Sequence, residues 1–94
     1  MNISFLTNKY FIEFIEVLIL ILVILITGNY FLISCTLVLC LYLGGPLTTG
    51  NPAVVFTLYR ANKINSEDLL FYLIAEILGV VIGFEVYNRI FRKD

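Results

Sequence analysis

The sequence predicts an all-α membrane protein with three membrane-spanning helices and one short re-entrant half-helix. Of its 94 residues 61% are apolar, whereas soluble domains contain roughly 45–50%. The apolar residues form three long runs, and a helix-start signal, Asn51-Pro52-Ala53, lies between the second run and the third. We therefore expect one repeat over residues 1–94 and an integral membrane location, in a membrane that the sequence does not specify.

The first two spans are predicted from unbroken apolar runs and the breaks that follow them. The first covers residues 10–26, with ten consecutive apolar residues from Val17 onward. Thr27-Gly28-Asn29 is typical of a turn. The second span then covers residues 30–43 and ends before Gly44-Gly45-Pro46.

A re-entrant loop and half-helix are predicted over residues 44–61. Asn is among the best N-cap residues, and Pro is favoured at the first helical position. A helix from Pro52 to Ala61 would be ~15 Å long, about half the hydrocarbon thickness of a bilayer. Its N-terminal N–H groups would be costly facing lipid but useful along a water-filled path.

The third span is predicted over residues 67–88, with Ser66 as its expected N-cap. Its first turn carries acidic residues, which suit the helix dipole. Gly79 and Gly83 are one turn apart, a spacing of small residues that lets helices pack closely in membranes. We expect these two glycines to serve helix packing.

The basic residues are balanced between the two sides of the predicted membrane. An odd number of spans places the chain ends on opposite sides, and each side receives three cations: Lys9, Arg60 and Lys63 on one, Arg89, Arg92 and Lys93 on the other. Because orientation follows Lys/Arg asymmetry, the sequence predicts that the chain inserts both ways.

Composition excludes several function classes. The chain has no His and few scattered carboxylates, which leaves little material for a hydrolytic triad or a zinc site. Its net charge of −1 argues against nucleic acid as a partner. We expect no enzyme, no catalytic residues, no metal and no cofactor. Cys35 and Cys40 lie about 140° apart on a helix, which excludes a disulfide between them, and we expect both to be small buried residues.

Three segments together resemble one half of an aquaporin, a member of the major intrinsic protein family. Gly50-Asn51-Pro52-Ala53-Val54 looks like the loop of the N-terminal half. The segment from Tyr72 to Gly83 is similar to the third helix, which reads Tyr-x-x-Ala-Gln-x-x-Gly in the family. Ile12-Glu13-Phe14 resembles the opening of the first helix. Each half of that family carries three spans and a half-helix that opens with Asn-Pro-Ala.

The resemblance implies a passive water channel and a set of site residues. Asn51 would donate its side-chain amide into the pore, while Pro52 and Ala53 set the turn and allow contact with a second such loop. Glu13 and Glu76 would accept hydrogen bonds from the pore loop. Two further groups are implied: the pore-lining loop Leu47, Thr48, Thr49 and Gly50, and the candidate filter Phe31, Thr48 and Val54.

This chain departs from the family in three ways. Glu76 replaces a Gln, and Pro46-Leu47-Thr48-Thr49 replaces the Ser-Gly-x-His that precedes the motif. The second half, with its filter arginine, is missing, and Val54 stands at the corresponding position. We therefore expect two copies, inserted oppositely, to complete the channel within a higher homo-oligomer in membrane lipid. Val54 predicts a less polar filter that admits small neutral solutes such as glycerol as well as water.

Two alternatives stay open. A small dual-topology proton-coupled transporter would depend on Glu13 or Glu76, because carboxyls within membrane helices are functional candidates. Alternatively, the chain is a non-transporting half that needs a different partner chain carrying the missing arginine. Of the other carboxyls, Glu16 is expected at the interface, and Glu85 is expected to extend toward it from near the end of its helix.

Overall fold

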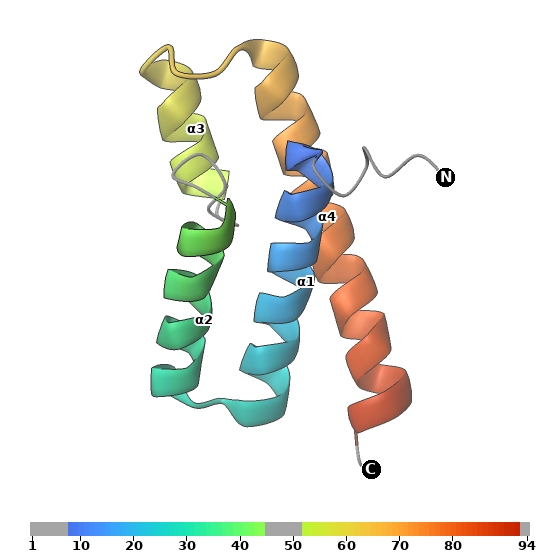
Figure 1. Cartoon of the computed structure of the whole chain (residues 1–94). Helices are drawn as coiled ribbons and strands as arrows, with labels where there is room; N and C mark the ends of the chain where they lie inside the picture. The colour runs from blue at the N-terminus through green and yellow to red at the C-terminus, as the bar shows by residue number, and fades with distance from the viewer. Residues whose placement is uncertain (1–7, 45–51, 93–94) are drawn as a thin grey trace, which may run out of the picture.

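The computed structural model describes residues 8–44 and 52–92, and every regular element in these ranges is helical (Figure 1). This confirms the predicted all-α class. The elements are α1 (Lys9–Thr27), α2 (Tyr30–Gly44), α3 (Pro52–Arg60), α4 (Ser66–Val86) and a π-helical turn, η2 (Tyr87–Phe91). The predicted pore-lining residues Leu47, Thr48, Thr49 and Gly50, and Asn51 of the motif, lie outside the described residues.

Local hydrogen bonds define α1 and the turn after it. Asn8 is the N-cap, and its side chain accepts hydrogen bonds from two N–H groups of the first turn. Gly28 ends the helix in the left-handed region at φ 58°, where its N–H donates to the carbonyl of Ile24. The Asn29 side chain then accepts from the first turn of α2. The chain therefore reverses direction at the predicted turn.

A Schellman motif ends α3. Asn62 has φ 61°, and its N–H donates to the carbonyl of Tyr59 at 3.1 Å. The N–H of Lys63 reaches back to Leu58 at 2.8 Å. These two bonds satisfy carbonyls that a helix end otherwise leaves unpaired, and Asn tolerates the left-handed conformation that they require.

The N-cap of α4 is Asn65, so the prediction of Ser66 as the cap is wrong. Asn65 has the extended backbone of a cap residue, and its side-chain oxygen accepts the N–H of Asp68 at 2.7 Å. Asn and Ser cap about equally well, so the sequence alone could not choose between two adjacent candidates.

Helices α1 and α4 run parallel and form the main contact of the fold (Figure 1). Helix α2 packs on α1, and helix α3 packs on α4. A Cβ added to Gly79 would lie 2.8 Å from the Cβ of Val17, and one added to Gly83 would lie 3.3 Å from the Cβ of Ile21. The two glycines therefore lie where the α1 backbone approaches α4 most closely.

Within residues 8–44 and 52–92, two helical segments are long and apolar enough to cross a membrane, namely Lys9–Thr27 with a mean hydropathy of 2.6 and Ser66–Phe91 with 2.2. Only 17% of the apolar stretch of the first segment and 28% of that of the second are buried, whereas a core helix of a soluble protein is mostly buried. Helix α2 has 15 residues, or ~22 Å, less than the ~30 Å of a bilayer core.

Candidate functional site

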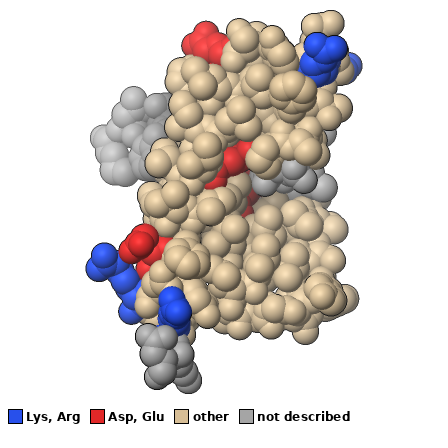
Figure 2. Space-filling view, turned by 180° about the vertical axis from the view of Figure 1, so that it is seen from behind, with Lys and Arg blue, Asp and Glu red and all other residues tan. Residues whose placement is uncertain are grey.

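Three glutamates are buried among the apolar helices. Glu13 is 0% exposed, Glu76 3% and Glu16 7%. Viewed from behind, acidic atoms lie at mid-height, deep between residues that carry no formal charge (Figure 2). Burial of Glu16 corrects the expectation that it lies at the interface. Its place near the start of an apolar run suggested exposure, but α2 folds back over this face of α1.

The carboxyls of Glu13 of α1 and Glu76 of α4 are neighbours in the interior. The parallel packing of the two helices brings the side chains to the same level. Two neighbouring carboxylates in an apolar interior repel each other and are poorly solvated, so the pair holds at most one negative charge. These two residues were both singled out from the sequence, and the fold brings them together.

Glu16 has a polar neighbour on α2, because Cys40 lines the same cavity beside its carboxyl. Cys40 is half-buried, whereas Cys35 is exposed. The expectation of two buried apolar cysteines is therefore wrong for Cys35, and it missed the polar contact of Cys40. The spacing of residues along one helix could not reveal a partner on another.

Helix α3 begins beside the carboxyl pair. Pro52 lines a cavity of about 210 Å³ together with Val17, Glu76 and three aliphatic residues of α4. Val17 is the ninth of 19 residues in α1, and Glu76 is the eleventh of 21 in α4. The N-terminus of α3, the positive end of its dipole, therefore lies level with the middle of both long helices. From there α3 runs toward the end at which α4 starts (Figure 1).

The described candidate filter residues lie apart within one chain. Val54 is in the first turn of α3 and is 37% exposed. Phe31 is in the first turn of α2 and is 74% exposed, on an outer groove that it shares only with α2 residues. Phe31 thus lies toward the opposite end of the molecule from α3 (Figure 1). Thr48, the third candidate, lies outside the described residues.

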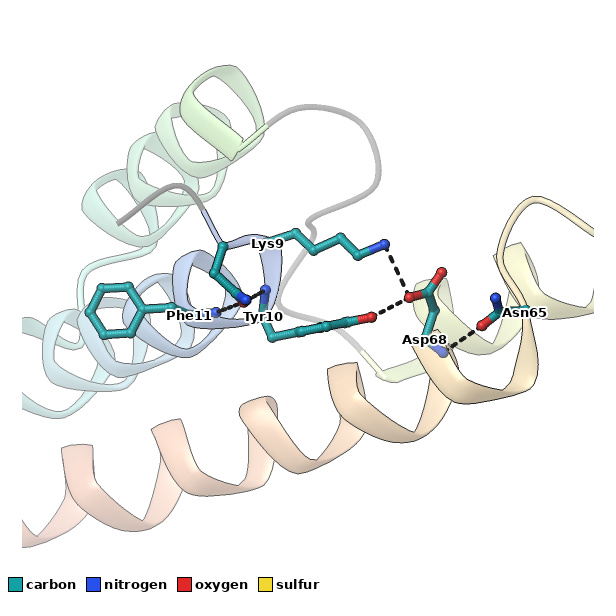
Figure 3. Close-up of polar contacts among 6 residues, drawn as sticks. Lys9, Tyr10, Phe11, Asn65 and Asp68 are labelled. Carbon is teal, nitrogen blue, oxygen red and sulfur yellow. Dashed lines mark hydrogen bonds and ion pairs between the residues drawn. The ribbon is translucent and has the colours of Figure 1, made fainter. Parts of the chain in front are cut away.

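A polar clasp joins the starts of α1 and α4 (Figure 3). The ammonium of Lys9 lies 3.0 Å from the Asp68 carboxylate, and the Tyr10 hydroxyl donates to the same oxygen. The Tyr10 ring also packs edge-on against the buried ring of Tyr72, with centroids 5.2 Å apart. From the sequence, Asp68 is expected only to favour the helix dipole in the first turn of its helix. No local sequence pattern links it to Tyr10, which is 58 positions earlier. The clasp fixes the register at which Glu13 and Glu76 meet.

The described cations lie at the two ends of the molecule (Figure 2). Arg60 is the last residue of α3 and Lys63 lies in the α3–α4 connection, at the end where Lys9 binds Asp68. Arg89 and Arg92 follow α4 at the other end, where Arg89 lies 3.2 Å from Glu85.

Among the described residues, no group of three or more His, Cys, Asp or Glu side chains is placed to hold a metal ion. Comparison of the chain with protein-family models, with curated proteins and with solved structures finds no match.

Proposed function

We propose that this chain is one half of a passive membrane channel for water and small neutral solutes such as glycerol, completed by a second copy in the inverted orientation. The observation that carries the proposal is the position of α3. Its first residue, Pro52, lines a cavity beside Glu76, level with the middle of both long helices. A nine-residue helix that starts at mid-depth suits a re-entrant half-helix better than a span.

In this account three segments cross the membrane. Helices α1 and α4 supply two spans on the strength of their length and exposed apolar surface. Helix α2 supplies the third, and residues 44–61 form the re-entrant loop and half-helix that follow it. Three spans and one re-entrant half-helix make up the fold expected of one aquaporin half.

The need for a second copy comes from the open end of α3. Pro52 and Ala53 are exposed, so the positive end of the α3 dipole would face lipid in a single copy. Two inverted copies would place two such N-termini face to face at the midplane. Their α3 helices, ~14 Å each, would together cover about 27 Å of the ~30 Å core. The even division of Lys and Arg permits both orientations.

The mechanism follows from two facing half-helices. The paired Asn51 amides orient the central water molecule of a single file that passes through the pore. The backbone carbonyls of residues 47–50 accept hydrogen bonds from the other water molecules of that file. The two positive helix ends repel protons and other cations, as in aquaporin-type pores generally. Inversion also brings Phe31 of each copy to the half of the membrane that holds Val54 of the other, where the pair would narrow the pore.

The Glu13–Glu76 pair has a supporting role in this mechanism. It lies beside the start of α3, so its oxygens can accept N–H groups of the chain that enters that helix. A pair with at most one negative charge holds the positive helix end in place and leaves the pore nearly neutral.

Osmotic shrinkage of liposomes that contain only this purified chain tests the function. We expect stopped-flow light scattering to report faster water loss than from empty liposomes. The activation energy of this water permeation should be near that of water diffusion in bulk solution. Water loss no faster than from empty liposomes would reject a channel built from this chain alone. It would favour the alternative in which the chain is a non-transporting half that needs a different partner chain.

A second candidate, proton-coupled transport, is favoured by one observation. Asp68, Tyr72 and Glu76 follow at four-residue intervals along α4, from the carboxylate held by Lys9 to the buried carboxyl pair. Rows of titratable side chains within membrane helices are typical of proton relays. These groups could pass protons to the interior. Glu13→Gln distinguishes the two functions: it should abolish a proton-coupled flux but leave passive water flow largely intact.

A further inference from the structure

An apolar groove of about 360 Å³ runs along the α1–α4 contact. Its walls are aromatic near the start of the helices and aliphatic further along, and include Tyr10, Phe11 and Phe14 of α1 and Phe71, Leu78 and Ile82 of α4. Buried Ala75 forms part of its floor and leaves room between the walls.

The groove lies on the other side of α4 from α3. Leu78 lines the groove and Val80 lines the cavity at Pro52, and these two positions are about 200° apart around a helix. A second copy that faces α3 would therefore leave the groove open to the membrane. Phe71 and Ile82 are separated by 11 residues, or ~16 Å, which is about one leaflet of the hydrocarbon core.

A cation stands at the aromatic end of this groove. The Lys9 ammonium lies 5.3 Å above the ring centroid of Tyr10, which lines the groove. Asp68 holds this ammonium at 3.0 Å, yet the Lys9 side chain remains 51% exposed. Lysine carries three N–H donors, so Lys9 can bind Asp68 and still donate to a second anionic oxygen.

We propose that this groove binds one phospholipid, with an acyl chain between α1 and α4 and the headgroup phosphate on Lys9. An apolar slot one leaflet deep with a fixed cation at its interfacial end matches the chemistry of that molecule. The inference needs α1 and α4 to cross a membrane, but it does not depend on what the chain transports.

Native mass spectrometry of the delipidated, detergent-solubilised chain, titrated with phosphatidylglycerol, tests the site. We expect one phospholipid to bind ahead of all others, and Lys9→Gln to weaken this first binding about fivefold. Lys9→Arg should retain it. Lys63→Gln is the matched control, because it removes an exposed cation at the same end but away from the groove, and it should bind as the parent chain does.

A second pair of variants tests the groove without touching a charge. Leu78→Trp should fill the groove and lower the affinity, whereas Leu70→Trp adds the same ring to a comparably exposed leucine of α4 outside it. If Lys9→Gln and Leu78→Trp both bind phosphatidylglycerol as well as their controls, the proposal is wrong. Diacylglycerol that binds the parent chain as tightly as the phospholipid would likewise overturn it, since it lacks the phosphate.

Discussion

Glu13 and Glu76 are neighbours in the interior, although the two residues are 63 positions apart in the sequence and are 0% and 3% exposed. Buried carboxyls in a membrane helix are costly and are retained where they have a role. The carboxyl pair lies between the two long helices at the level where α3 begins. In the proposed channel, it links the helix packing to the position of the pore loop.

Replacement of Glu76 by Gln should preserve folding and water flux. The amide can donate a hydrogen bond to Glu13 and still offer an oxygen acceptor, and Gln is the residue implied by the aquaporin resemblance. Glu76→Leu should instead lower the free energy of unfolding by about 1–3 kcal/mol, because Glu13 then loses this buried partner. Chemical denaturation and stopped-flow shrinkage measure the two effects. If Glu76→Gln lost water flux while it still folded, the supporting role would be refuted in favour of proton-coupled transport.

Gly79 should tolerate substitution less well than Gly83. A methyl group at Gly79 would lie 2.8 Å from the Cβ of Val17 and 2.9 Å from the carbonyl of Phe14, which is backbone and cannot rotate away. We expect Gly79→Ala to destabilise the chain by about 1–3 kcal/mol. Gly83→Ala, with its nearest contacts at 3.3 Å, should cost less. Equal midpoints of unfolding in detergent would contradict the close packing of α1 on α4.

Asn51→Asp tests the pore motif, which lies just before the described start of α3. Asp caps a helix about as well as Asn, so the variant should fold. A negative charge at the midplane would offset the positive helix ends that repel cations. We expect a measurable proton or cation leak, followed with a pH-sensitive dye in liposomes under an imposed voltage. Parent-like water flux without any leak would indicate that Asn51 only caps the helix.

Much of the architecture was accessible from the sequence because its signals are local. Gly28, Pro52 and the apolar runs place the helix ends within a few residues of those observed. The interior was only partly accessible. Burial of Glu16, its place beside Cys40 and the Lys9–Asp68 clasp all arise from contacts between different helices. Helical periodicity states which residues share a face, but not which helix covers that face.

The central claim, that two opposed copies form the pore, is tested most directly by variants locked in one orientation. Arg89→Gln with Arg92→Gln leaves the cations concentrated at the Lys9 end, and Arg60→Gln with Lys63→Gln leaves them at the other. By the positive-inside rule the two double variants should insert in opposite directions, which terminal tags can verify.

Water permeability is then measured by stopped-flow shrinkage of membrane vesicles from cells that express either double variant alone or both together. Our account predicts permeability near that of vesicles without the chain for each variant alone, and recovery of the parent value when both are present. Full permeability from a variant that inserts in one direction only would contradict it.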